Sequence, residues 1–394
     1  MITTVETKNE FFNYYQNKGF VREVGIGPQK NADYWKLLLV NSVLVRFTPV
    51  FEGQETLSSP LCSQQVGFSD IPEKVEGSDG YLTSFEQIGT GSQQHIDEKA
   101  ATIFWEFFEH RLSMDRQNFS VTIPEGDESA YKIWSKLGFT DLQIRPRKGN
   151  ILNVDDNKVG GNYSAIVYDR GSQYHQEHDV ECHLDCSCGR FSELGDIGFL
   201  QGRKGSKLID SGVGLERLVV VLNENSSVFQ SGSLKEIQDL VLANGQFVNA
   251  DPNALKVVTD HLRTVVTLIN GDVLPSNKGA GYIVRKLIRN MCLSAMDLGV
   301  TSSNLSSQVD KVAQILTSNQ YISSVNRGNI AQIIKIEEEK FMALIKKGKS
   351  TFDKFISGKT FISTADLHNL YSTYGLPEEI IRKLAMENGI SITN

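Results

Sequence analysis

The sequence lacks long apolar runs, an excess of positive charge and an even set of cysteines, and each absence excludes a class of protein. No stretch approaches the roughly 18 to 20 apolar residues that span a bilayer, and residues 1–6 lack the basic and apolar regions of a secretory signal. The net charge of −7 over 394 residues excludes a protein that binds nucleic acid by overall charge alone. Five cysteines are present, so we expect a reduced, cytoplasmic protein that does not associate with a membrane.

The composition is that of a globular protein with an uneven distribution of charge. A hydrophobic fraction of 40% and a charged fraction of 22% exclude bulk disorder. Residues 255–349 carry 13 Lys+Arg and seven Asp+Glu, so the remainder has a net charge of −13. A basic segment on an acidic protein indicates either a local site for a polyanion or a solvated helical face.

Hydrophobic periodicity divides the chain into two parts. In the first part, the predicted helices span 7–20, 93–113 and 215–222, and the predicted strands span 119–123, 162–168 and 198–201. In the second part, the predicted helices span 255–270, 281–298, 307–318 and 329–347. The sequence therefore predicts an α+β domain with an antiparallel sheet over 1–232 and an all-helical domain over 233–394.

The first segment that could form a binding or catalytic site is a short apolar strand followed by Gly-x-Gly and then a helix. Gly212 and Gly214 permit close approach of the backbone to a ligand, and a helix start favours anions. Arg217 could donate to a phosphate oxygen, and Asp210 could hold an ammonium group. The alternative is a plain strand–helix turn in which Glu216 and Arg217 are solvated.

The second segment is a turn followed by a basic helix. Arg285 and Arg289 are four residues apart and share one helical face, with Lys286 beside them. Asn277 and Lys278 lie in the turn that precedes the helix. The pattern suits phosphate contacts combined with reading of a base edge by Asn277, and the alternative is an amphipathic helix with a solvated basic face.

The third segment, residues 174–188, contains three of the seven histidines and three of the five cysteines. Thiolates and imidazoles are preferred ligands of tetrahedral Zn²⁺. Cys182, Cys186 and Cys188 with one histidine, His183, are the candidate set. The alternative is a surface loop with unrelated thiols, because this spacing is not that of a standard zinc finger.

Four motifs occur along the chain: Phe-Glu-Gln-Ile-Gly at 85–89, Asp-x-Gly-x-Gly-Leu-Glu-Arg at 210–217, Asp-His-Leu-Arg at 260–263 and Gly-Asp-Val-Leu-Pro-Ser-Asn at 271–277. Together they resemble the motifs of the alanyl-tRNA synthetase family. The resemblance is strongest over 208–290 and extends more weakly over the whole chain. It implies a class II synthetase core followed by a helical tRNA-binding domain, without the family's editing and C-terminal domains.

The family activates alanine with ATP and Mg²⁺, releases pyrophosphate and transfers the aminoacyl group to tRNA. On that pattern Asp210 and Arg217 are the predicted catalytic residues. The predicted contacts of ATP are Glu86, Gln87, Gly214 and Arg217. The predicted contacts of the amino acid are Asp210, Gly212, Asp196 and Gly198. The predicted contacts of the tRNA acceptor stem are Asn277, Lys278, Arg285, Lys286 and Arg289.

The sequence departs from the family at two places. The stretch 60–64 lacks the arginine with which the family binds the α-phosphate, and Arg22, Arg46 or a lysine could replace it. Asp196 and Gly198 stand where the family has Asn and Val. A carboxylate beside extra space favours an amino acid with an additional donor or cation over alanine.

These departures leave three functions open. The first is ATP-dependent activation of an amino acid followed by transfer to tRNA. The second is a non-catalytic tRNA-binding paralogue, and the third is a ligase that passes an activated amino acid to a small molecule or carrier.

Overall fold

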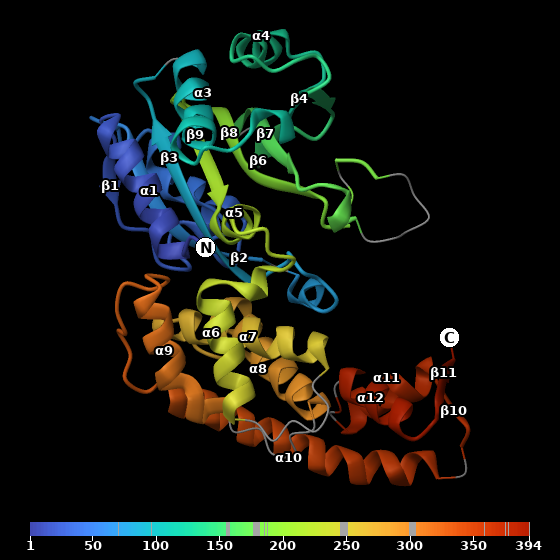
Figure 1. Ribbon diagram of the computed structural model, residues 1–394. Coiled ribbons are helices and arrows are strands. Elements are labelled where there is room, and N and C mark those ends of the chain that lie inside the picture. Colours follow the sequence, from blue (N-terminus) through green and yellow to red (C-terminus); the bar gives the residue numbers. More distant parts are fainter. Residues whose placement is uncertain are drawn as a thin grey trace.

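The computed structural model describes residues 1–394 except 70, 96, 155–157, 176–181, 185, 187, 245–250, 299–304, 358, 375, 377 and 394. The described residues form an α+β half and a helical half, which lie against each other (Figure 1). Among these residues, no helix combines the length and apolar character needed to cross a membrane.

Nine strands of the described α+β half form one sheet, in the order β1-β2-β3-β9-β8-β7-β4-β5 with β6 beside β7. The strands are β1 (Val21–Glu23), β2 (Leu61–Phe68), β3 (Ser84–Ser92), β4 (Phe119–Pro124), β5 (Ile144–Arg147), β6 (Ile151–Val154), β7 (Val159–Asp169), β8 (Phe191–Gly202) and β9 (Lys207–Gly214). Two edge pairs, β1 with β2 and β4 with β5, are parallel. All other pairs are antiparallel, as the sequence predicts.

The helices of this half begin and end at recognisable signals. Its α-helices are α1 (Thr4–Asn17), α2 (Thr48–Phe51), α3 (Asp97–Glu106), α4 (Glu128–Lys136) and α5 (Leu215–Leu222). Its shorter helical turns are η1 (Ala32–Trp35), η2 (Val43–Phe47), η3 (Pro72–Val75), η4 (Phe107–Arg111), η5 (Arg116–Asn118), η6 (Ser172–Tyr174) and η7 (Val228–Gln230). Helix α1 begins earlier than predicted because Thr3 and Glu6 form a capping box. It ends before Gly19, whose φ of 90° suits glycine.

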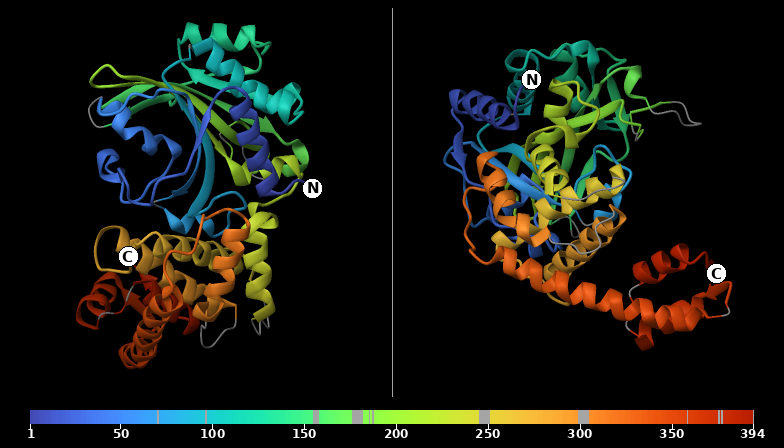
Figure 2. Two further views of the ribbon diagram at one scale, coloured as in Figure 1. Left: turned by 90° about the vertical axis from the view of Figure 1, so that its left-hand side faces the viewer. Right: turned by 60° about the horizontal axis from the view of Figure 1, so that its bottom comes forward.

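Different layers cover the two faces of the sheet. Helices α1, α3 and α5 cover one face with an apolar core that includes Phe11, Phe104 and Leu218. The segment that contains η2 and α2 covers the other face, where Phe47 and Phe51 are buried. Figure 2 shows the sheet between these two layers. Because side chains alternate along a strand, neighbouring residues of β3, β8 and β9 enter different layers.

The helical half is built on α7, nearly all of which is buried. Its helices are α6 (Gly232–Asn244), α7 (Pro252–Asn270), α8 (Gly279–Asp297), η8 (Leu305–Gln308), α9 (Val309–Ser318), α10 (Ile330–Ile356), α11 (Thr364–Tyr374) and α12 (Glu378–Glu387). The long helix α10 leads away from the sheet to α11 and α12 (Figure 1). Two short strands that the sequence did not predict, β10 (Phe361–Ser363) and β11 (Ser391–Thr393), form a parallel pair there.

A buried charge cluster joins the two halves. Lys8 of α1 donates to the Glu86 carboxylate at 2.8 Å and to the backbone oxygen of Asn319 at 2.7 Å. Arg263 of α7 donates to the Glu216 carboxylate at 3.0 Å, and the Glu86 backbone N–H donates to the same carboxylate at 2.9 Å. All four charged groups are therefore paired across or beside the junction of the two halves.

Candidate functional site

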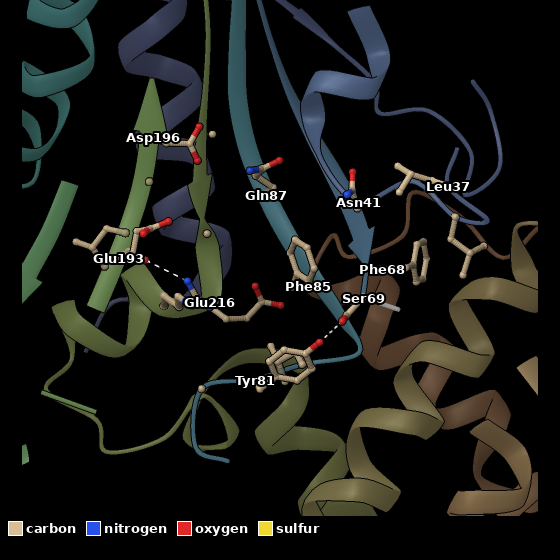
Figure 3. A pocket seen from close by; sticks show the side chains of 18 of the residues that line it. Leu37, Asn41, Phe68, Ser69, Tyr81, Phe85, Gln87, Glu193, Asp196 and Glu216 are labelled. Carbon is tan, nitrogen blue, oxygen red and sulfur yellow. Dashed lines mark hydrogen bonds between the residues drawn. The ribbon is translucent and has the colours of Figure 1, made fainter. Parts of the chain in front are cut away.

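The candidate site is a cavity of about 560 Å³ beside the junction of the two halves (Figure 3). Strands β3, β8 and β9 and the start of α5 form one side, and the loops at residues 36–41 and 80–82 form the other. Helix α8 contributes Ile283. The cavity is therefore bounded mainly by the α+β half and is closed in part by the helical half.

The register of three strands produces a floor of glycines and polar side chains. Gly212 of β9 lies between Gly89 of β3 and Asp196 of β8. A Cβ atom on Gly212 would come within 2.3 Å of the Gln87 Nε2 atom, so the glycine makes room for that side chain. The Gln87 Oε1 atom accepts from the Val43 backbone N–H at 2.7 Å, which fixes the amide.

Five residues that the sequence predicts for ATP or the amino acid line this one cavity. They are Gln87, Asp196, Gly212, Gly214 and Arg217. Two more, Gly198 and Asp210, face each other at the next positions of the same face of β8 and β9. The fold therefore brings together predicted residues from three separate segments of the sequence.

Glu86 does not lie on the cavity wall. Its neighbours Phe85 and Gln87 line the cavity, whereas the Glu86 carboxylate lies in the opposite layer, bonded to Lys8 and to the Gln64 side chain at 2.6 Å. The reason is that successive side chains of β3 point to opposite faces of the sheet. Of the two predicted ATP contacts on β3, Gln87 therefore lines the cavity and the Glu86 side chain does not.

Two carboxyl groups on this sheet face, Asp196 on the cavity wall and Asp210 beside it, have raised pKa values. Burial, together with the negative charge of Glu193, raises the pKa of Asp196 to about 7. Asp210 is 8% exposed, and burial followed by the charge of Asp196 raises the pKa of its carboxyl well above the ordinary value. Within the described residues neither group has an ion-pair partner in the protein.

Two cations line the cavity, Lys36 and Arg217. Arg217 donates to the backbone oxygen of Glu193 at 3.4 Å and is exposed. The other candidates for the lost arginine lie elsewhere: Arg46 is paired with Glu23 and Glu55, and Arg22 stacks on Phe12 beside a different cavity. Lys36 was not predicted individually, because no motif surrounds it.

The predicted basic ridge on α8 is only partly solvated. Arg285 pairs with Glu337 at 3.0 Å and also donates to the Asn277 side chain. Lys286 pairs with Glu73 of the α+β half. Arg289 lies 5.5 Å from the centre of the Phe341 ring. Asn277 and Lys278 are exposed at the start of the helix.

The predicted metal-binding segment brings together a set that differs from the predicted one. The ligand atoms of His175, Cys182 and Cys188 lie within 4.8 Å of one another, and the two sulfur atoms are 3.5 Å apart. His183 and Cys186 are not part of this group. His175 follows η6 and Cys188 precedes β8, so the group joins residues from the two ends of the predicted segment.

Comparisons with known proteins agree with the motifs. The chain is 30% identical to the alanine–tRNA ligase of Acetivibrio thermocellus and 29% identical to that of Natranaerobius thermophilus, over 98% and 99% of its length. It spans about half the length of these relatives, 46% and 47%. A similar solved structure is the Staphylococcus aureus histidyl-tRNA synthetase, with a TM-score of 0.36, 11% identity and coverage of 55% of this chain and 69% of that chain. The model of the family described as tRNA synthetases class II (A) matches residues 6–394, and the chain therefore belongs to that family.

Proposed function

We propose that the protein uses ATP to activate an amino acid as an aminoacyl-adenylate and transfers the aminoacyl group to the acceptor stem of a tRNA. The observation that carries this proposal is the single cavity in which Gln87, Asp196, Gly212, Gly214 and Arg217 meet. Membership of the synthetase family and similarity to alanine–tRNA ligases support it.

In the proposed reaction, a carboxylate oxygen of the amino acid attacks the α-phosphorus of ATP, and the bond to pyrophosphate breaks. Asp210 holds the α-ammonium group, and the glycine floor lets the substrate approach the backbone closely. Phe85 and Gln87 contact the adenine. Arg217 and Lys36 neutralise the negative charge that shifts onto the departing phosphates. They act mainly by electrostatic stabilisation of the transition state, because both cations are already positioned in the cavity.

The proposed reaction uses Mg²⁺ with ATP, and Mg²⁺ prefers oxygen ligands. Two glutamates line the cavity, Glu193 and Glu216. The Glu216 carboxylate already accepts from the Glu86 backbone and from Arg263. The Glu193 side chain is 43% exposed and lies 3.7 Å from Arg147, so it is the better candidate to contact the ion or its water shell.

ATP–pyrophosphate exchange over a panel of amino acids tests the activation step. We expect exchange with at least one amino acid, and Arg217→Ala should lower its rate about 10² to 10³-fold, the usual effect of losing a positioned donor. Arg145→Ala removes an exposed arginine of β5 outside the cavity and should leave the rate unchanged. Absence of exchange with every amino acid, combined with tRNA binding, would favour the non-catalytic paralogue.

The acceptor distinguishes the two catalytic alternatives. In the proposed function, AMP release in the presence of the correct amino acid increases when tRNA is added, and labelled amino acid becomes attached to the tRNA 3′ end. AMP release that RNA does not change would instead favour a ligase for a small molecule. For tRNA, we propose contacts at Asn277, Lys278 and Arg289, supported by the exposure of the turn.

We also propose a zinc ion at His175, Cys182 and Cys188. One imidazole and two thiols within 4.8 Å of one another fit the chemistry of tetrahedral Zn²⁺. Elemental analysis of protein purified without added metal should find about one zinc per chain. Cys182→Ser should abolish the zinc content, whereas Cys292→Ala in the helical core should retain it. A wild-type protein without zinc that also fails to bind added Zn²⁺ contradicts the site.

A further inference from the structure

Two carboxyl groups lie on the sheet face that forms the cavity floor: Asp196 lines the cavity, and Asp210 is its neighbour on that face, next to the lining residues. Asp196 lies opposite Gly212, and Gly198 lies opposite Asp210, in the antiparallel pair β8 and β9. Asp196 and Asp210 are therefore diagonal neighbours, whose Cα atoms typically lie about 7 to 8 Å apart. The influence of the Asp196 charge on the acidity of Asp210 agrees with that proximity.

The glycines around these two groups create space rather than flexibility. A Cβ atom on Gly198 would lie 2.6 Å from the Asp210 Oδ1 atom. A side chain at position 198 would therefore displace the Asp210 carboxyl from its place over the floor. With glycine there, the Asp210 carboxyl lies beside position 198, on the same sheet face as Asp196. Asp196 itself lines the cavity together with Gln87 (Figure 3).

Within the part of the chain that the structure describes, no salt bridge supplies a counter-charge to Asp196 or Asp210. The charged lining residue nearest in sequence to Asp196 is Glu193, which adds negative charge. Arg217 points to the backbone oxygen of Glu193, and the described residues contain no ion pair to Asp196 or Asp210. A buried charge without a partner is unfavourable in free energy. A ligand with two positive groups can pair with both carboxylates, so it should gain more binding free energy here than a ligand with one positive group.

We propose that Asp196 binds a second cationic group of the substrate, and that the amino acid activated here is a short aliphatic diamino acid. This inference rests on the proposed function and deepens it. Asp210 holds the α-ammonium group, and the side-chain ammonium group lies against Asp196. The short separation of two diagonal neighbours suits two to four carbons between the nitrogens, as in 2,3-diaminopropionate, 2,4-diaminobutyrate and ornithine.

Matched substrate pairs test the inference with the wild-type chain. Each diamino acid is compared in ATP–pyrophosphate exchange with the isostere in which a methyl group replaces the side-chain ammonium group: 2-aminobutyrate, norvaline and norleucine. We expect at least one diamino acid to exceed its isostere in kcat/KM by about 10 to 100-fold, the usual effect of a charge-assisted contact. Alanine, glycine, serine and lysine complete the panel.

An isosteric variant assigns the effect to the side chain. Asp196→Asn should abolish the preference for the diamino acid over its neutral isostere, measured as the ratio of the two kcat/KM values, and Asp310→Asn on exposed α9 should leave that ratio unchanged. Alanine or another neutral amino acid as best substrate, or a preference that survives Asp196→Asn, would overturn the inference while the proposed function stands. Absence of exchange with every amino acid would instead overturn the proposed function.

Discussion

Lys8 tests how the two halves of the molecule hold each other. Its ammonium group is fully buried and donates to the Glu86 carboxylate at 2.8 Å and to the backbone oxygens of Asn319 and Gln320 at 2.7 and 2.9 Å. Lys8 and Glu86 belong to the α+β half, whereas Asn319 and Gln320 follow α9 in the helical half. Lys8→Met retains a long apolar side chain and removes the charge together with all three hydrogen bonds.

The expected loss of stability depends on pH. Removing one partner of a buried ion pair costs about 3 to 5 kcal/mol, and we expect about 3 kcal/mol near pH 8, because Gln64 still donates to Glu86. Burial raises the pKa of Glu86 to about 7, and Lys8 opposes that rise. Without Lys8 the pKa of Glu86 in the folded variant is higher still, so the folded variant keeps this proton at pH values at which the unfolded chain has released it. The stability of the variant then falls more steeply with rising pH than that of the wild type, and the loss should be smaller near pH 6 than near pH 8.

Urea unfolding with two probes measures both effects. All three tryptophans, Trp35, Trp105 and Trp134, lie in the α+β half, so their fluorescence reports that half, whereas circular dichroism reports the helices of both. The two transitions should coincide in the wild type and separate in Lys8→Met. Lys132→Met, on the exposed surface of α4, is the control and should change stability by less than about 0.5 kcal/mol. A loss below about 1 kcal/mol near pH 8, or the same loss at both pH values, would refute the reasoning.

Three further predictions address the cavity and the RNA surface. Gly198→Ala should weaken amino-acid binding at least about tenfold and leave ATP binding unchanged, because the new Cβ atom displaces Asp210; calorimetric titration of each ligand measures this. Affinity for a diamino acid should rise with pH through about 7 as Asp196 ionises, and Asp196→Asn should flatten the profile; a flat wild-type profile contradicts the role. Lys278→Ala combined with Arg289→Ala should reduce the salt slope of tRNA binding by about two, one for each phosphate contact, in filter binding at several salt concentrations; an unchanged slope would show a solvated face.

The fold could be predicted where local signals are strong. Helix α5 occupies the predicted residues 215–222, because Gly-x-Gly precedes its apolar run and Asn223 follows it. Strand β8 is three times longer than the predicted 198–201, since its glycines and charged residues do not alternate with apolar ones. It is nevertheless a strand because β7 and β9 pair with it on both sides. Such long-range pairing leaves no local pattern.

The sequence predicted which residue types form the candidate site, but it did not predict on which face of the sheet each side chain lies. Glu86 and Gln87 are adjacent in one motif, yet β3 directs them into opposite layers, so only Gln87 reaches the cavity. Lys36 comes from a loop whose position depends on tertiary packing, and no spacing rule finds it. The register of β8 and β9 also determines which ligand the site can bind. A shift of one residue between these strands would place Asp196 and Asp210 on opposite faces of the sheet, and the two carboxylates could then not contact the same substrate.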